Sequence, residues 1–222
     1  MTIDAIIFDF DGVLIESEYV GNVNIAKVLT DLGYPTTVEQ SLDTFVGLGG
    51  RDFVEAVERY IGGDIPEAFY AARKIEDARV LAEGLDAVIG AVEFVRSLPA
   101  SLPRAIASSS TTHWITTHLD HLGLRDAFGD HIYSGREHVA RGKPAPDIYL
   151  YAAKQIGADV TRTLIIEDSP VGVTGAVASG AQVVGLAVGR HCGDGHDVKL
   201  RAAGVQQVAY SFDEITRLMT DR

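Results

Sequence analysis

Short apolar runs alternate with longer amphipathic stretches along most of the chain. The runs are rich in aliphatic and β-branched residues and too short for helices, which is typical of buried strands. They are residues 5–8, 104–107, 131–133, 163–166 and 182–186. From residue 84 onward they alternate with helical periodicity at residues 86–97, 112–123, 146–157 and 170–180. This alternation predicts an α/β fold in which helices cover both faces of a parallel sheet.

A long segment separates the first two predicted strands. It spans about ninety residues, far more than one crossover helix needs. Residues 17–83 show helical periodicity and no convincing strand, with glycine-containing breaks at residues 33–35, 46–50 and 62–63. We therefore expect a helical domain at residues 16–83, inserted into a core domain formed by residues 1–15 and 84–222.

The composition is that of a soluble globular protein and argues against several classes of partner. The chain of 222 residues has 19 Lys and Arg against 31 Asp and Glu, a net charge of −12. Such an acidic surface repels phosphate backbones and anionic lipid, so we expect neither nucleic acid nor a membrane as partner. A lone cysteine, Cys192, fits a reducing compartment, and the first residues lack the basic region of a signal peptide. The expectation is a cytoplasmic monomer that acts on a small molecule.

Carboxylates and a hydroxyl residue follow three of the predicted strands. They are Asp9, Asp11, Ser108, Glu167 and Asp168. Because ligands bind at the carboxyl ends of strands in an open parallel sheet, these groups should converge, together with Lys143 from a loop. Crowded carboxylates disfavour one another's ionisation, and a bound cation resolves that conflict. An all-oxygen set of ligands suits Mg²⁺ better than zinc or copper.

This set of residues predicts phosphoryl chemistry. A cation and Lys143 would neutralise a phosphoryl group, whose transfer needs mainly positioning and charge stabilisation. Ser108 and the backbone turn that follows it, beginning at Ser109, would bind phosphate oxygens. One carboxylate could attack phosphorus to give an aspartyl-phosphate, while its neighbour two residues on moves the proton.

These motifs resemble the haloacid dehalogenase superfamily of Mg²⁺-dependent phosphatases. Residues 9–13 read Asp-Phe-Asp-Gly-Val, and Ser108, Lys143 and the pair Glu167-Asp168 follow in the family's order. More narrowly, the chain resembles the β-phosphoglucomutase-like and sugar-phosphatase branch. The resemblance covers the whole chain and implies a Rossmann-like core with a helical cap domain.

The resemblance also assigns roles to individual residues. It implies that Asp9 is the nucleophile and Asp11 the general acid and base, with Lys143 at the transferring phosphoryl group. It implies Mg²⁺ held by the Asp9 carboxylate, the backbone carbonyl of Asp11 and Asp168, with Glu167 near or in the ligand shell.

Departures from the mutase pattern favour simple hydrolysis. Gly21 stands where the mutases carry a histidine that assists transfer back to a sugar, and Thr111 stands where they carry a lysine. The arginine that grips a second phosphate in mutases aligns with Gly50, one residue before Arg51. We expect hydrolysis of a small phosphorylated metabolite, with a sugar phosphate as the expected class. A hexose-phosphate mutase is the alternative, and a phospho-accepting signalling module is a more distant one.

Several further residues allow two interpretations. Arg51 and Lys74 in the helical domain could reach an anionic substrate, but each equally fits a solvated helix face. Ser110 is predicted to cap the next helix. Residues 191–196 contain two histidines and Cys192 but lack a paired second half of ligands, so we do not predict a metal site there.

Overall fold

The computed structural model describes residues 3–220. The chain divides into two compact units, one formed by residues 1–16 and 85–222 and the other by residues 17–84. The expected boundaries lie one residue away from these. Within the described residues, no helix is long and apolar enough to cross a membrane.

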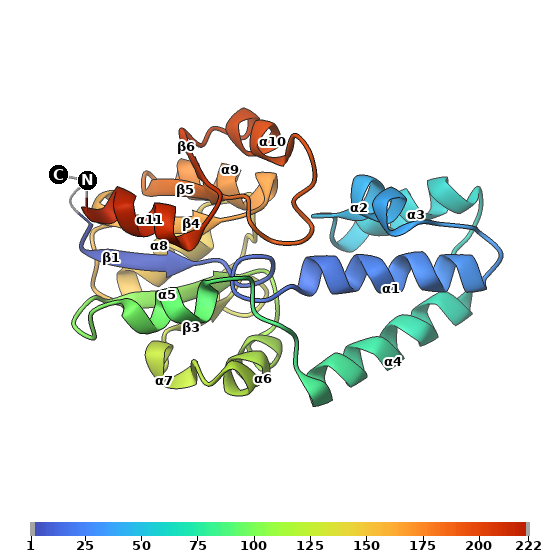
Figure 1. Cartoon of the computed structure of the whole chain (residues 1–222), viewed down its shortest axis with the longest axis horizontal. Coiled ribbons are helices and arrows are strands. Elements are labelled where there is room, and N and C mark those ends of the chain that lie inside the picture. The colour runs from blue at the N-terminus through green and yellow to red at the C-terminus, as the bar shows by residue number, and fades with distance from the viewer. Residues whose placement is uncertain (1–2, 221–222) are drawn as a thin grey trace. The chain divides into compact units, whose positions relative to one another are not determined.

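The first unit is built on a six-stranded sheet (Figure 1). Its strands are β1 (Ala5–Phe8), β2 (Arg104–Ser108), β3 (Ile132–Ser134), β4 (Thr163–Glu167), β5 (Gln182–Leu186) and β6 (Gln207–Ala209). They lie in the order β3-β2-β1-β4-β5-β6, and every neighbouring pair is parallel. The predicted parallel α/β sheet is therefore confirmed, with β1 near its centre.

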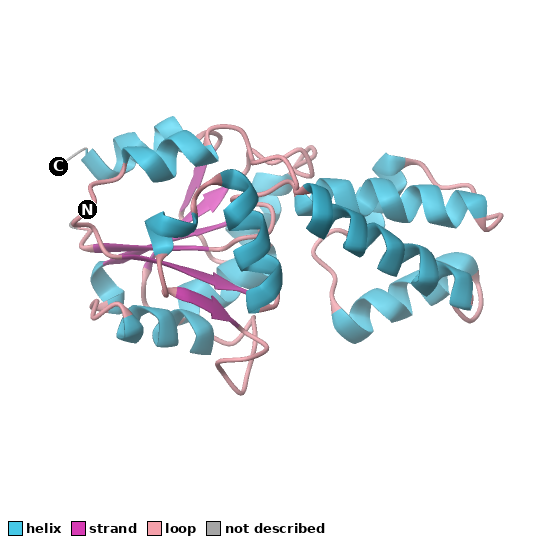
Figure 2. Ribbon diagram, turned by 90° about the horizontal axis from the view of Figure 1, so that it is seen from below, coloured by secondary structure: helices cyan, strands magenta, loops and turns pink. Residues whose placement is uncertain are grey.

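Helices cover both faces of this sheet (Figure 2). They are α5 (Ala91–Ser97), α6 (Thr112–Leu122), α7 (Arg125–Phe128), α8 (Asp147–Gln155), the 3₁₀ turn η1 (Val160–Arg162), α9 (Pro170–Ala178), α10 (His196–Ala202) and α11 (Phe212–Thr220). Ile6 and Phe8 of β1 pack in one apolar cluster with α5, α6 and α11. Ile7 points to the other face and packs with α8 and α9. The alternation of side chains along a strand thus divides the core into two layers.

Some elements differ from the sequence-based expectation. The helix predicted at residues 86–97 begins only at Ala91, because Gly90 before it adopts a left-handed backbone with φ of 82°. The strand β6 and the helices α7, α10 and α11 were not predicted. The first three are only three, four and seven residues long, too short to show a clear periodicity.

The second unit is a helical bundle. Its helices are α1 (Ser17–Asp31), α2 (Val38–Phe45), α3 (Gly50–Ile61) and α4 (Glu67–Glu83). They share an apolar core of their own that includes Leu29, Phe45, Val57 and Phe69. The predicted glycine-containing breaks fall between these helices, except that Gly50 begins α3, and no strand occurs among the described residues of this unit.

The sheet order brings three strand ends together. β1 pairs with β2 on one side and β4 on the other. Asp9 directly follows β1, Ser108 is the last residue of β2, and Glu167 is the last residue of β4. The backbone N–H of Asp9 donates to the Ile166 carbonyl at 2.9 Å, which extends the β1–β4 pairing to Asp9. The chain adds β2 and β3 on one side of β1 and then crosses to β4 on the other side, and this reversal of strand order opens a crevice for ligands in such sheets.

Candidate active site

Lys143 lies between two carboxylates at this edge of the sheet. Its Nζ donates to Asp9 Oδ1 at 2.5 Å and to Glu167 Oε1 at 2.6 Å. The three side chains are almost fully buried, with 5%, 9% and 0% of their surface exposed. Burial without partners would make each of these charges very costly, so the three groups are held together as a unit.

Glu167 is committed on both of its oxygens. Tyr149 donates to Oε1 at 2.7 Å, in addition to Lys143, and the Ser169 N–H and hydroxyl donate to Oε2 at 3.0 and 3.1 Å. Burial opposes ionisation of Glu167, but the ammonium and these donors outweigh it and hold its pKa below the ordinary value. Gly172 makes this possible, since a Cβ there would lie 1.8 Å from Oε1. Glu167 is therefore fixed in place, and its hydrogen bond in turn orients the ammonium of Lys143.

Asp168 has a different environment from its neighbour. Its Oδ2 lies 2.8 Å from Nε2 of His191. Its Oδ1 is buried and has no hydrogen-bond partner among the described residues. Gly12 packs against this carboxylate with φ of +78°, and a Cβ at that position would come within 2.0 Å of Oδ2. One oxygen of Asp168 is thus anchored, while the other is left for a ligand that the protein does not supply.

The electrostatics of the cluster favour a cation. Burial raises the pKa of Asp9 well above its ordinary value, and repulsion from Glu167 adds to the effect although Lys143 opposes it. Burial and the charge of Glu167 raise the pKa of Asp168 in the same way. Ligand oxygens of Asp9, Glu167 and Asp168 lie within 4.8 Å of one another. The donor set and the unpartnered Oδ1 of Asp168 fit Mg²⁺, which prefers carboxylate oxygens.

Asp11 is held by side chains of the β2–α6 segment. Ser108 and Ser110 donate their hydroxyls to Asp11 Oδ2 at 3.2 and 2.6 Å. Trp114, on the first turn of α6, donates its indole N–H to Oδ1 at 3.1 Å. The prediction that Ser110 caps the following helix was wrong, because Thr111 is the N-cap and accepts from the Trp114 backbone. Ser110 faces Asp11 instead, so it belongs to the site.

Comparison with known proteins now identifies the family. The model of a family described as haloacid dehalogenase-like hydrolase matches residues 3–180. The chain belongs to the haloacid dehalogenase-like hydrolases. The motifs at Asp9, Ser108, Lys143 and Glu167-Asp168 all lie within the matched region.

Relatives of this hydrolase act on phosphorylated compounds, as their names state. It is 31% identical over 188 residues to a probable pseudouridine-5′-phosphatase of Drosophila melanogaster, covering 80% of this chain and 79% of that one. It is 28% identical over 184 residues to fructose-1-phosphate phosphatase of Escherichia coli, covering 81% and 94%. Among solved structures, a haloacid dehalogenase family hydrolase of Deinococcus radiodurans with bound phosphate and sodium is 31% identical with a TM-score of 0.86, covering 99% and 96%.

The hydrolase brings most of the predicted site residues into one unit. Hydrogen bonds join Lys143 to both Asp9 and Glu167, and Ser108 to Asp11. Ser109, beside Ser108, is exposed. The two predicted substrate contacts of the helical unit, unlike the buried residues of the core unit, are exposed to solvent. Arg51 has 89% of its side chain exposed and pairs with Glu55, and Lys74 is also exposed.

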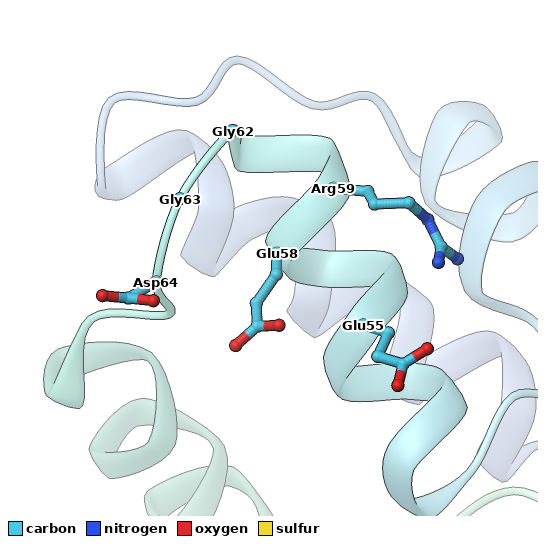
Figure 3. Close-up of a pocket in the computed structure, with 6 residues that line it drawn as sticks. All are labelled: Glu55, Glu58, Arg59, Gly62, Gly63 and Asp64. Carbon is cyan, nitrogen blue, oxygen red and sulfur yellow. The ribbon is translucent and has the colours of Figure 1, made fainter.

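A surface pocket in the helical unit does not resemble a phosphate site (Figure 3). It has a volume of about 570 Å³ and is lined by Glu55, Glu58, Arg59, Gly62, Gly63 and Asp64. Figure 3 shows its three carboxylates pointing in different directions rather than toward a common centre. With three acidic side chains and one basic side chain, the pocket disfavours an anionic ligand.

Sequence reasoning missed two aromatic members of the site. Tyr149 supports Glu167, and burial raises its pKa well above the ordinary value, so it stays protonated and donates. The sequence offered one clue to this role, since Tyr149 lies on the buried apolar face of α8 and its hydroxyl needs a hydrogen-bond partner there. Trp114 contacts Asp11, and it is the single tryptophan of the chain. No motif marks it, because its partner lies 103 positions away.

Proposed function

We propose that this hydrolase is a Mg²⁺-dependent phosphatase that acts on a small phosphorylated metabolite through an aspartyl-phosphate on Asp9. One observation carries the proposal. A buried lysine joins Asp9 to Glu167, while the neighbouring Asp168 keeps one buried oxygen without a hydrogen-bond partner in the described part of the chain. Such an arrangement supplies a nucleophile, a fixed positive charge and a cation ligand at one strand edge, which are the requirements of phosphoryl transfer.

The proposed reaction has two steps. In the first, a carboxylate oxygen of Asp9 forms a bond to phosphorus as the bond to the substrate's alkoxide oxygen breaks, and Asp11 gives that oxygen a proton. In the second, Asp11 takes a proton from a water molecule that attacks phosphorus. Inorganic phosphate leaves, and the Asp9 carboxylate is restored.

The remaining residues would stabilise charge. Asp9, Asp168 and the backbone carbonyl of Asp11 would hold Mg²⁺, which neutralises negative charge at the reacting phosphoryl group. Glu167 is also close enough to contribute, although its oxygens already accept four hydrogen bonds. Lys143 would contact phosphoryl oxygens, and Ser108 and the backbone at Ser109 would donate to them.

A sugar phosphate is the substrate class that we propose. It rests on the names of the two curated relatives, both of which act on a phosphorylated sugar or ribosyl compound. The helical unit would serve as the cap, with Arg51 and Lys74 as contacts for the rest of the substrate. A mutase is less well supported, since Gly21 offers no side chain to return the phosphoryl group to a sugar.

A screen for phosphate release tests the proposal. The purified protein would be assayed against sugar phosphates, a nucleoside monophosphate and phosphoglycolate, with Mg²⁺ and with EDTA. We expect Mg²⁺-dependent release from at least one sugar phosphate. The Asp9→Asn variant should fold and release none, and Asp4→Asn, which changes an exposed aspartate on the same segment, is the matched control. Isomerised phosphosugars without free phosphate would establish the mutase instead.

A further inference from the structure

Beyond the residues that would hold the cation, two histidines of the segment after β5 contact Asp168, one in the loop and one at the start of α10. His191 and His196 are both buried, with 4% and 7% of their surface exposed. His191 Nε2 lies 2.8 Å from Asp168 Oδ2, and His196 Nε2 lies 2.6 Å from the Asp168 backbone carbonyl. The two rings meet edge to face with centroids 5.5 Å apart. A side-chain oxygen of Asp168 is therefore contacted from the loop, and its backbone carbonyl is contacted from the first residue of α10.

We propose that His191 is a positioning residue for the cation: its Nε2–H holds Oδ2 of Asp168 and thereby directs Oδ1 into the site. This inference rests on the proposed function, because it assumes that Asp168 binds Mg²⁺. A carboxylate held by one oxygen cannot rotate freely, so its second oxygen has a fixed direction. Donors behind a metal ligand are known to set ligand orientation and metal affinity in this way.

The residues packed around the His191 ring restrict its orientation. A Cβ on Gly189 would lie 2.6 Å from His191 Nδ1 and Cε1, and a Cβ on Gly12 would lie 3.0 Å from Cε1. The ring thus lies in a slot between two glycines, one of which belongs to the Asp9–Gly12 motif. Neither glycine could carry a side chain without moving His191 or Asp168.

The loop itself is anchored to the start of the chain. The backbone N–H of Arg190 donates to both carboxylate oxygens of Glu16, at 3.0 and 3.3 Å. Glu16 is buried, with 3% of its surface exposed. A tight turn follows, in which Gly193 N–H donates to the His191 carbonyl at 3.0 Å. The ring of His191 is therefore supported from its backbone as well as from its slot.

The same cluster has a second interpretation as a separate metal site. Ligand atoms of His191, Cys192 and His196 lie within 4.8 Å of one another. Both Nε2 atoms, however, already lie at hydrogen-bonding distance from Asp168, and burial raises the pKa of the Cys192 thiol and disfavours a thiolate. A soft metal would have to displace the contacts to Asp168. The geometry favours the positioning role.

The test compares Mg²⁺ binding in His191 variants by calorimetry on the metal-free protein. His191→Phe keeps a planar ring but removes the donor, and we expect its Mg²⁺ dissociation constant to rise about 10–100-fold. His191→Gln restores an N–H near the Nε2 position and should recover most of the affinity. His113→Phe, at an exposed histidine of α6, is the matched control and should bind like the unchanged protein. Thermal unfolding in the same buffer reports the structural effect of each change separately.

The outcomes separate this inference from the proposed function. If His191→Phe binds Mg²⁺ as tightly as the unchanged protein, the positioning role is wrong and the phosphatase proposal stands. The positioning role is equally wrong if His191→Phe and His191→Gln lose affinity alike, since the donor then has no part. If the unchanged protein binds no Mg²⁺, both the phosphatase proposal and the positioning role are wrong, because each requires Mg²⁺ at Asp168.

A measurement on the unchanged protein covers the case in which His191→Phe does not fold. Histidine ¹⁵N spectra at neutral pH should show the His191 proton on Nε2, with a resonance that shifts when Mg²⁺ is added. An unprotonated Nε2 would overturn the inference, because tautomers assigned from heavy-atom positions need such a check.

Discussion

The sheet edge of the core unit and the helix surfaces of residues 17–84 treat charge in opposite ways. At the sheet edge, Asp9, Lys143, Glu167 and Asp168 are buried, and the contacts between them are fixed by the fold. On the helical unit, charged side chains pair three or four positions along the same helix and remain largely in solvent, as Arg51 does with Glu55. Water solvates these exposed charges, so they need no particular partner in the protein.

This contrast explains why chemistry can be assigned in one region and not in the other. A buried charge must have a partner, so its presence in the sequence predicts a specific arrangement. An exposed charge carries no such requirement. The core unit therefore supports a proposal for the chemistry, while the exposed charged side chains of the helical unit cannot be distinguished by sequence from ordinary surface residues.

Removing Lys143 should have the largest effect. In the metal-free protein, Lys143→Met leaves Asp9 and Glu167 buried without a counter-charge and should lower the free energy of unfolding by about 3–5 kcal/mol. Activity should fall by several orders of magnitude, since the reacting phosphoryl group loses its fixed cation. Urea denaturation in EDTA measures the stability.

A double variant provides the control for that change. Glu167→Gln combined with Lys143→Met removes one of the two uncompensated charges, so it should be more stable than Lys143→Met alone. If Lys143→Met unfolds at the same urea concentration as the unchanged protein, the buried pairing does not contribute as described.

Asp168→Asn should have a smaller effect and the opposite sign in stability. Removing one buried carboxylate relieves repulsion with Glu167, so we expect the metal-free variant to gain about 1 kcal/mol, as is common when a functional site is relaxed. The asparagine oxygen can still accept from His191. The variant should lose the rise in melting temperature that Mg²⁺ gives the unchanged protein. A stabilising effect of Mg²⁺ that persists in Asp168→Asn would contradict the assigned ligand.

The raised pKa values of Asp9 and Asp168 give this effect a pH dependence. A carboxyl whose pKa is higher in the folded state favours folding below its ordinary pKa of 3.8, and that contribution is lost as the pH rises through the folded value. The pKa of Glu167 is lowered, so its contribution is lost at the acid end instead. As the pH rises above 3.8 without metal, the melting temperature of the unchanged protein should fall relative to that of Asp168→Asn. Parallel curves would show that Asp168 does not titrate as described.

Trp114→Phe should have a moderate effect confined to catalysis. The change removes the indole donor to Asp11 and keeps an aromatic ring, so we expect kcat to fall about 5–10-fold, the equivalent of one hydrogen bond. KM should change little, because Trp114 contacts Asp11 rather than the phosphate ligands. Steady-state kinetics against the unchanged protein measure both constants, and an unaltered kcat would remove Trp114 from the site.

The smallest effects should come from the helical unit. Arg51→Ala and Lys74→Ala should leave the melting temperature unchanged, because both side chains are exposed. If they contact substrate, KM should rise up to about 10-fold while kcat stays constant, the pattern expected for uniform binding. Lys27→Ala, on another exposed pair of the same unit, is the matched control. A hundredfold loss of kcat in either variant would break the contrast between the two regions.

The sequence predicted the parts of the molecule whose signals are local. Five strands follow from short apolar runs, and the motif at Asp9–Gly12 marks the sheet edge. What it missed depends on distant contacts or on backbone geometry. Trp114 reaches Asp11 across 103 positions, and no spacing rule predicts that contact.

The sequence also did not show which role each of two adjacent residues with similar side chains would take. Glu167 and Asp168 are adjacent acids, yet their side chains point in different directions, because side chains alternate along the strand and a different glycine packs against each. As a result, Glu167 pairs with Lys143 and Asp168 contacts His191. Ser110 and Thr111 are both good N-caps by residue type, and only the backbone conformation at Thr111 selects between them.

Trapping the covalent intermediate would test the central claim most directly. The protein would be mixed with Mg²⁺ and its best phosphorylated substrate, quenched rapidly, and reduced with borohydride, which converts an aspartyl-phosphate to homoserine. Peptide mass spectrometry then locates the converted residue. The account predicts homoserine at position 9 of the unchanged protein and no converted residue in the Asp9→Asn protein. Conversion at another aspartate, or turnover by the unchanged protein with no conversion at Asp9, would contradict it.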